Sequence, residues 1–170
     1  MNLVQDGESN YLREKSQEVP QEMFSTDGLK NMIEGMFEVL KKETDGVALA
    51  GPQVELPYRV FVVAPGLAGV SQLAPLIYIN PRLENASKEK IFMEEGCLSV
   101  RWLYGEVKRH TKVSIVAQDI SGKVFKRGAS GLLAHIFQHE IEHLDGTLFI
   151  DKARKVVRLD DETIRKMSNK

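Results

Sequence analysis

The segment FQHEIEHLDG, at residues 137 to 146, places two histidines four residues apart with a glutamate directly after the first. On a helix, His139 and His143 would lie about 40° apart around the axis and about 6 Å apart along it, close enough for both imidazoles to bind one metal ion. Glu140 would project beside the open position of that ion, where a carboxylate can carry a proton. The spacing therefore indicates a catalytic metal site, although the same residues can also form the solvated polar face of an ordinary helix.

The same helix carries further residues close to these histidines. Leu132 and Ile136 continue the face of His139 and His143, so we expect this face to be buried, and a buried polar group without a partner costs about 1 to 3 kcal/mol. Metal binding would give both histidines a partner. His135 lies one turn earlier, about 12 Å along the axis from His143, which is too far to share one ion. We therefore expect His135 to be a partly buried neighbour of the site.

A catalytic metal site normally has three protein ligands and one open position, so the two histidines need a third ligand from elsewhere. The residues after 146 offer only acidic side chains within a charged stretch. Upstream, EEGCLSV at 94 to 100 holds the single cysteine, Cys97, where a tight turn could present its thiolate. A lone cysteine is more often a small buried hydrophobic residue, so Cys97 on its own leaves both interpretations open.

Three motifs occur in one order along the chain: GVALAGPQ at 46 to 53, EGCLS at 95 to 99 and QHEIEHLDG at 138 to 146. They resemble the three motifs of the peptide deformylase family, which are written G-x-G-[LI]-A-A-x-Q, E-G-C-x-S and Q-H-E-x-D-H-L. The N-terminal LREKSQEV also resembles the opening region of that family, so the resemblance extends over nearly the whole chain. A cysteine motif followed by HExxH is far more specific than HExxH alone.

The resemblance implies an α+β fold in which the HExxH helix is wrapped by antiparallel strands. It implies a hydrolase that removes the N-formyl group from the starting methionine of new polypeptides and releases formate. The partners would be N-formyl-methionyl peptides and nascent chains. The cofactor would be one divalent metal ion per chain, with Fe(II) as the native metal and Zn, Ni or Co as alternatives, all of which suit thiolate and imidazole ligands.

The resemblance also assigns roles to residues by their position in the motifs. Glu140 would be the general acid and base, and Gln53 together with the backbone N–H of Leu98 would stabilise the developing oxyanion. The metal ligands would be Cys97, His139 and His143. The residues expected to contact the peptide substrate are Gly46, Val47, Ala48, Gly96, Tyr104, Leu132 and His135.

Some residues depart from the family pattern. Ala48 replaces a glycine and Gly51 an alanine, so a substrate strand pairing with this loop would meet an extra methyl group at Ala48. Glu142 replaces the usual aspartate, and we expect it to point to the Gln138 side of the helix without loss of the metal. The largest departure is RWLYGE at 101 to 106, which should border the methionine pocket.

Length and composition predict one domain over residues 1 to 170, with 151 to 170 as a charged C-terminal helix or tail. The net charge of -1 gives no overall attraction for nucleic acid or anionic lipid. No stretch approaches the roughly 20 apolar residues of a membrane span, so we expect a cytoplasmic protein with no membrane partner. We expect a monomer without a specific nucleic-acid partner, in which the seven Lys/Arg and four Asp/Glu of residues 151 to 170 make at most a weak contact with the ribosome.

Sequence periodicity predicts the elements that position the motifs. A first helix should follow the STD cluster at 25 to 27 and stop before TDG at 44 to 46, because apolar residues recur between them at helical spacing. A second helix should run from the N-cap Ser130 to the DG at 145 to 146 and carry HExxH. Strands, the last two of them forming a hairpin, are predicted at 59 to 64, 75 to 80, 112 to 119 and 123 to 129.

Two other functions agree with parts of the sequence. A zinc peptidase that uses HExxH would cleave internal peptide bonds. A deformylase-like binding protein with weakened catalysis would be consistent with Ala48, Gly51 and Arg101. We favour the deformylase because every residue that carries the chemistry in the three motifs is present.

Overall fold

The computed structural model describes residues 1–67 and 76–168. Residue 75 of one predicted strand and residues 169 and 170 of the predicted C-terminal helix or tail lie outside the described residues. The helices are α1 (Asp27–Lys42), α2 (Gly131–Leu144), α3 (Asp161–Ser168) and the short 3-10 turns η1 (Asn10–Arg13), η2 (Gln21–Met23), η3 (Gly51–Val54) and η4 (Phe149–Asp151). The strands are β1 (Ala48–Ala50), β2 (Val60–Val63), β3 (Ile77–Ala86), β4 (Lys90–Cys97), β5 (Val100–His110), β6 (Lys112–Gln118), β7 (Val124–Ser130) and β8 (Arg154–Arg158).

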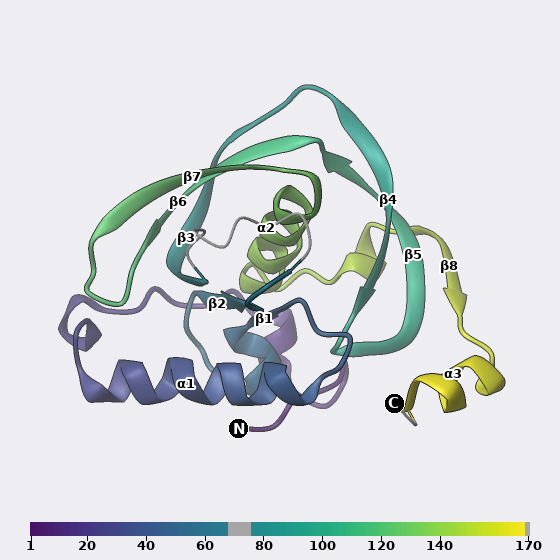
Figure 1. The fold of residues 1–170 in the computed structure, drawn as a ribbon, viewed down its shortest axis with the longest axis horizontal. Helices are drawn as coiled ribbons and strands as arrows, with labels where there is room; N and C mark the ends of the chain where they lie inside the picture. Colours follow the sequence, from purple (N-terminus) through teal and green to yellow (C-terminus); the bar gives the residue numbers. More distant parts are fainter. Residues whose placement is uncertain (68–75, 169–170) are drawn as a thin grey trace.

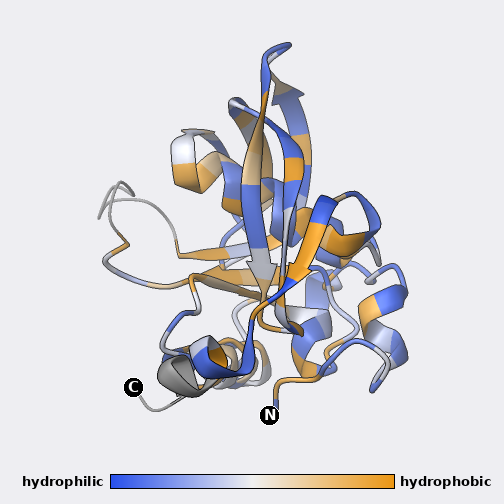
Figure 2. Ribbon diagram, turned by 90° about the vertical axis from the view of Figure 1, so that its right-hand side faces the viewer, coloured by the Kyte–Doolittle hydropathy of each residue, from blue (hydrophilic) through white to orange (hydrophobic). Residues whose placement is uncertain are grey.

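Two antiparallel sheets surround the central helix α2 (Figure 1). The larger sheet has the strand order β1-β2-β3-β6-β7, and the smaller one has the order β4-β5-β8. Hydrophilic and hydrophobic residues alternate along the long strands (Figure 2), as expected where one face of a sheet packs inward and the other meets water. The fold is therefore α+β with the HExxH helix enclosed by antiparallel strands, as predicted.

Helix α1 lies below the larger sheet in Figure 1 and covers one side of the core. Its N-cap Thr26 accepts a hydrogen bond from the backbone N–H of Leu29 at 3.2 Å, which satisfies one of the free N–H groups at the helix start. The apolar stripe predicted from the sequence faces inward: Leu29, Met32, Ile33, Met36 and Leu40 are buried, and Phe37 is half-buried. The predicted first helix is confirmed.

The core between the larger sheet and α2 is built around aromatic side chains. Phe61 of β2 stacks on Tyr78 of β3 with ring centroids 4.6 Å apart, and Phe137 of α2 contacts the Tyr78 ring edge-on at 5.0 Å. Such pairs contribute about 0.5 to 1.5 kcal/mol beyond the burial of their area. This cluster fixes the face of α2 that packs on the sheet, and so it also fixes which face turns to the smaller sheet.

The predicted strands at 59 to 64 and 112 to 129 are confirmed as β2 and the β6–β7 hairpin. The prediction at 75 to 80 was too short, because β3 continues to Ala86. Its second half is exposed and charged, which hides the period of two on which the prediction relied. Strands β4, β5 and β8 were not predicted at all. Within β4 and β5, Cys97 stands at the end of β4, and Leu98 and Ser99 form the turn into β5.

Helix α2 starts and ends as predicted, but its first turn differs from the expectation of a fully buried face. Ser130 occupies the N-cap position without a side-chain hydrogen bond. Ile136 is 3 % exposed, whereas Leu132 is 38 % exposed, so the prediction that Leu132 lies on a buried face was wrong. The helix emerges from the core at this end, which leaves Leu132 at the rim of a cavity.

The C-terminal residues extend the smaller sheet and then turn into a short helix. Strand β8 pairs with β5, with Tyr104 opposite Val157, and Leu159 N–H donates to the carbonyl of Trp102 at 2.9 Å. The assignment of the whole chain to one domain stays a prediction. Within residues 1–67 and 76–168, no helix combines the length and apolar character that crossing a membrane requires.

Gly146 gives a test of how α2 is terminated. Its φ is +75°, and a Cβ there would lie 2.7 Å from the carbonyl oxygen of Arg13. Gly146→Ala should lower the free energy of unfolding by about 2 kcal/mol or more, because left-handed backbone costs an L-residue about 1 to 2 kcal/mol and the clash adds to it. Denaturant unfolding of the variant measures the loss.

Gly128→Ala is the matched control, since nothing lies within 4 Å of its added Cβ and its φ is not positive. It should unfold at or slightly above the wild-type midpoint. Equal midpoints for the two variants would contradict the proposed constraint at Gly146.

Candidate active site

Three side chains that could bind a metal ion meet between α2 and the end of β4. Cys97, His139 and His143 each offer one ligand atom, and these atoms lie within 4.8 Å of one another. The Cys97 Sγ is 3.1 Å from His143 Nε2, and the two imidazole centroids are 4.9 Å apart. The four-residue spacing stacks the histidines on one face of α2, and the tight turn after β4 presents the thiol to them.

The chemistry of these donors fits a divalent metal ion. His139 Nδ1 lies 2.8 Å from Glu95 Oε2, which leaves its Nε2 for a metal. Burial lowers the pKa of His143 well below its ordinary value, which favours the neutral imidazole that binds metal. Burial acts on the pKa of His139 in the same direction, but the hydrogen bonds of His139 with Cys97 and Glu95 outweigh it and raise that pKa instead. One thiolate and two imidazoles with a free fourth position are a ligand set typical of catalytic metal sites.

Glu140 follows His139 on the helix and lines the adjoining cavity. Its carboxylate is buried, and Oε2 has no hydrogen-bond partner among the described residues. Burial raises the pKa of Glu140 to about 7, because the charged form loses its hydration and the described part of the chain places no cation in hydrogen-bond contact with it. A carboxyl group with this pKa can both accept and donate a proton near neutral pH.

Gln53 lies on η3, and its side chain lines the same cavity. Its Oε1 accepts the backbone N–H of Ala50 at 2.8 Å, which orients the amide so that Nε2 donates to Ser99 Oγ at 3.2 Å and lies 3.6 Å from Cys97 Sγ. Leu98, between Cys97 and Ser99, lines the same cavity. Gln53 therefore brings a buried N–H donor to the turn that presents the thiol.

The N-terminal residues 4 to 6 form hydrogen bonds with η3 and with the β4–β5 turn. Val4 N–H donates to the Gln53 carbonyl at 3.0 Å, and Asp6 N–H donates to the Ser99 carbonyl at 2.8 Å. Between them, the Gln5 side chain donates to the Leu98 carbonyl at 3.0 Å. Three consecutive residues thus tie η3 to the β4–β5 turn.

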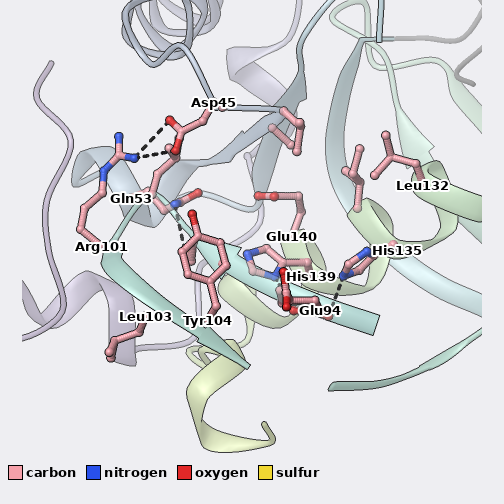
Figure 3. A pocket seen from close by; sticks show the side chains of 18 of the residues that line it. Asp45, Gln53, Glu94, Arg101, Leu103, Tyr104, Leu132, His135, His139 and Glu140 are labelled. Atoms are coloured by element: carbon pink, nitrogen blue, oxygen red, sulfur yellow. Dashed lines mark hydrogen bonds and ion pairs between the residues drawn. The ribbon is translucent and has the colours of Figure 1, made fainter. Parts of the chain in front are cut away.

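A cavity of about 250 Å³ opens beside Glu140 (Figure 3). Its walls come from the segment before and within β1, from the β4–β5 hairpin, and from the first turns of α2. All residues that the sequence suggested for substrate contact line it: Gly46, Val47, Ala48, Gly96, Tyr104, Leu132 and His135. The segment 101 to 104, which begins the largest departure from the family pattern, lines it as well.

Strand β1 leaves a free edge on this cavity, because it is the terminal strand of its sheet. Ala64 N–H donates to the Val47 carbonyl, whereas Val63 N–H points the other way to Leu76. Since hydrogen-bonding groups alternate along a strand, the N–H and C=O of Ala48, opposite Val63, face away from β2. An extended peptide could pair with this edge.

The structure accounts for two departures in this loop. The Ala48 side chain, which we expected to meet a substrate strand, is 5 % exposed and packs in the core cluster that contains Phe61, so the extra methyl group is largely out of the way. Gly51 stands where a Cβ would lie 2.7 Å from the carbonyl oxygen of Tyr58. The loop therefore needs glycine at 51 and tolerates alanine at 48.

Glu95 was overlooked in the sequence although it begins the EGCLS motif. It is 3 % exposed and accepts hydrogen bonds from Arg109 Nε at 2.5 Å and Nη2 at 2.9 Å. His135 Nε2 lies 2.7 Å from the same carboxylate, which also contacts His139. Burial raises the pKa of Glu95, but the hydrogen bonds from His135, His139 and Arg109 outweigh it and hold the pKa far below its ordinary value.

Glu95 is therefore ionised and has no proton to give, so the ring nitrogens that face it must carry the protons. This fixes the tautomer of His139 with Nε2 directed to the metal site. His135, predicted as a partly buried neighbour, is held by the same carboxylate. The sequence signal for Glu95 was an acidic residue two positions before Cys97 in the EGCLS motif. The sequence held no such signal for Arg109, because the pairing of β4 with β5 is what brings Arg109 to Glu95.

Glu142 extends the network to the surface. Its Oε1 accepts from Arg109 Nη1 at 2.6 Å and from Lys152 Nζ at 2.7 Å. The sequence placed Glu142 on the Gln138 side of the helix, and the structure agrees, because Gln138, Glu142 and Arg109 border one hollow of the surface. It contacts the metal ligands only indirectly, through Arg109 and Glu95.

Arg109 allows this network to be tested. Arg109→Met leaves the Glu95 carboxylate buried without its guanidinium partner, and we expect the free energy of unfolding to fall by about 3 to 5 kcal/mol, the usual cost of breaking a buried pair. Urea unfolding measures the change. The double variant Arg109→Met with Glu95→Gln should recover part of the loss, because the uncompensated charge is gone.

Lys126→Met is the control, since it removes an exposed ion pair with Glu84 on the larger sheet. It should leave the unfolding midpoint unchanged. A loss at Arg109 no larger than at Lys126 would contradict the structural role of the buried pair.

Comparison with known proteins gives one consistent family. Residues 1–159 match the family described as Polypeptide deformylase. The chain is 42% identical over 125 residues to "Peptide deformylase 1B, chloroplastic" of Solanum lycopersicum, covering 73% of this chain and 44% of that one. It is 39% identical over 150 residues to the peptide deformylase of Zymomonas mobilis, covering 86% and 82%. The chain thus spans about half the length of the plant relatives that it matches.

Solved structures agree with the sequence comparison. The structure of a peptide deformylase from Synechococcus elongatus in complex with actinonin matches with a TM-score of 0.80 and 32% identity, covering 90% of this chain and 80% of that one. An α+β fold of this type is therefore shared over most of the chain.

Proposed function

The chain belongs to the polypeptide deformylase family, and from this membership we propose that it is a metal-dependent hydrolase that removes the N-formyl group from formyl-methionine at the start of new polypeptides. The products are formate and a free amino terminus. The observation that carries the proposal is the convergence of two imidazoles, one thiol and the buried Glu140 at one end of a cavity that also exposes a free strand edge.

We propose that Cys97, His139 and His143 hold one divalent metal ion, with Fe(II) as the native metal and Zn, Ni or Co as substitutes. The donor set of one sulfur and two nitrogens supports this, since soft and borderline divalent ions bind such ligands. When bound, the metal would supply Lewis-acid polarisation and lower the pKa of water toward neutrality.

The remaining chemistry is assigned to side chains of the chain itself. Glu140 would take the proton of the attacking water and pass it to the leaving amine nitrogen, which would otherwise depart as an unfavourable anion. A pKa of about 7 suits both transfers. The Gln53 amide and the Leu98 N–H would donate to the oxygen that becomes negative in the tetrahedral state, an interaction worth about 3 kcal/mol in comparable sites.

The peptide would bind by adding a strand to β1. The Ala48 N–H and C=O would pair with its backbone, while the methionine side chain would enter the cavity between the β4–β5 hairpin and α2. Val47, Leu98 and Leu132 give that cavity apolar walls, which suits an unbranched, polarisable side chain.

The family match does not favour the zinc peptidase or the non-catalytic binding protein. Three finer points remain proposals: a location in the cytoplasm, a monomeric state, and a weak ribosome contact through the excess of basic residues in 151 to 170. Cosedimentation with ribosomes at low and high salt would test the last of these.

Formate release from formyl-Met-Ala-Ser by the iron-loaded protein tests the proposed activity, and Glu140→Gln tests the assigned acid and base. The amide keeps the shape of the carboxylate but cannot transfer the proton, so turnover should fall by about 100-fold or more. Metal content serves as the control and should be unchanged. Cleavage of casein without formate release would indicate a peptidase instead.

Cys97→Ala tests the metal ligands. Only two histidines would remain, and the negative charge that attracts a divalent ion would be lost, so the purified variant should contain little metal. Elemental analysis measures this directly. One equivalent of metal in an active Cys97→Ala protein would refute the assignment of Cys97.

Substrate preference tests the methionine pocket. Formyl-Met peptides should exceed formyl-Ala peptides in kcat/KM by roughly 10- to 100-fold, because two or three methylene-sized groups contribute about 0.8 kcal/mol each when buried. Steady-state kinetics on matched peptides measures the ratio. Equal values would mean that the side chain does not enter the cavity.

A further inference from the structure

The Arg101 side chain, which lines the cavity, joins two of its walls, the β4–β5 hairpin and the segment before β1 (Figure 3). Its Nη1 donates to Asp45 Oδ1 at 3.1 Å and Oδ2 at 2.9 Å, and its Nη2 pairs with Glu43. Arg101 belongs to β5, whereas both acids belong to the segment between α1 and β1. The Arg101 side chain is only 23% exposed, so the pairing is shielded from solvent more than an ordinary surface ion pair.

The backbone around Arg101 is held in an unusual conformation. Trp102 has a φ of +68°, which a bulky residue other than glycine rarely adopts. The neighbouring bonds over-determine this conformation, since Arg101 N–H donates to Gln5 Oε1 at 3.3 Å and the Trp102 carbonyl accepts Leu159 N–H. Strain held in place beside a cavity is a reason to look for a functional role.

Glu43 and Asp45, the two acids that Arg101 binds, lie in the segment that leads into the free edge of β1. Asp45 directly precedes Gly46, and Gly46 N–H donates to the Glu43 carbonyl at 3.0 Å. Gly46 is also confined, because an added Cβ would lie 2.8 Å from Leu40 and 3.2 Å from Leu98. Fixing residues 43 and 45 therefore fixes the backbone that leads into Ala48.

This inference rests on the proposed function. We propose that Arg101 is a positioning residue for the peptide: its pairing with Asp45 and Glu43 holds the 43–46 segment against the β4–β5 hairpin and so pre-forms the edge of β1 that the residues after formyl-methionine pair with. A pre-formed edge saves the ordering entropy that binding would otherwise have to supply. The role acts on peptide binding and leaves the chemical step alone.

A merely structural ion pair would have different consequences. It would change stability, and any effect on activity would appear in kcat or equally for every substrate. A positioning role raises KM with kcat unchanged, because the interaction is the same in ground and transition states. The rise should be large for formyl-Met-Ala-Ser and small for formyl-Met amide, which has no backbone beyond the first residue.

The experiment compares Arg101→Ala with wild type on these two substrates. We expect KM for the tripeptide to rise about tenfold, with kcat and the KM for formyl-Met amide within about twofold of wild type. The charge exchange Arg101→Asp with Asp45→Arg should restore part of the tripeptide affinity. Lys126→Ala, on the larger sheet, is the control and should match wild type. If Arg101→Ala does not fold, Asp45→Asn carries the same expectation.

Calorimetric titration in the Glu140→Gln background measures binding of the same tripeptide while turnover is about 100-fold slower or more. A rise in Kd of about tenfold on adding Arg101→Ala supports the positioning role, even if wild type releases no formate and the proposed activity fails. Formate release with an Arg101-independent KM and Kd overturns the positioning role alone. A fall in kcat, an equal rise in KM for both substrates, or absence of tripeptide binding in both proteins also overturns it.

Discussion

The buried carboxylate of Glu95 is the constraint on which the rest of the site depends. A charge removed from water is stable only when its hydrogen-bonding capacity is filled, and here the partners come from β5 and from two successive turns of α2. The smaller sheet and the helix must therefore meet in one relative position. That position also determines how far Cys97, two residues after Glu95 on the same strand, stands from the histidines.

The surroundings of the two buried glutamates in this site shift their pKa values in opposite directions. Glu95 and Glu140 are both buried, but Glu95 is surrounded by donors and stays ionised, whereas burial without a bonded cation raises the pKa of Glu140 to about 7. The first can orient a metal ligand because it never changes charge near neutral pH. The second can carry protons because it does. Amino-acid identity alone would not separate these roles.

Local sequence patterns predicted several helices and strands, whereas contacts that depend on pairing between distant strands could not be predicted. Helix α1, helix α2 and the β6–β7 hairpin follow from caps, periodicity and turns within one segment. The convergence of Cys97 with the histidines followed from a family resemblance, since no spacing rule relates residues more than 40 positions apart. Strands β4 and β5 were not predicted, because their outer faces carry charged residues. The role of Arg109 was missed for the same reason, since the pairing of these two strands determines its partner.

The departures from the family pattern gather around the peptide edge and leave the chemical groups intact. Ala48 turns its methyl group into the core, Gly51 admits the Tyr58 carbonyl, and Arg101 joins the segment before β1 to the hairpin. Among the described residues, none of these contacts involves Glu95, whose hydrogen-bond partners come from α2 and β5. The bonds around the proposed peptide edge and the bonds around the proposed metal ligands are thus separate sets. Sequence change can therefore alter the first without disturbing the second, which agrees with a chain that departs from the family pattern at 48, 51 and 101 and keeps all three proposed ligands.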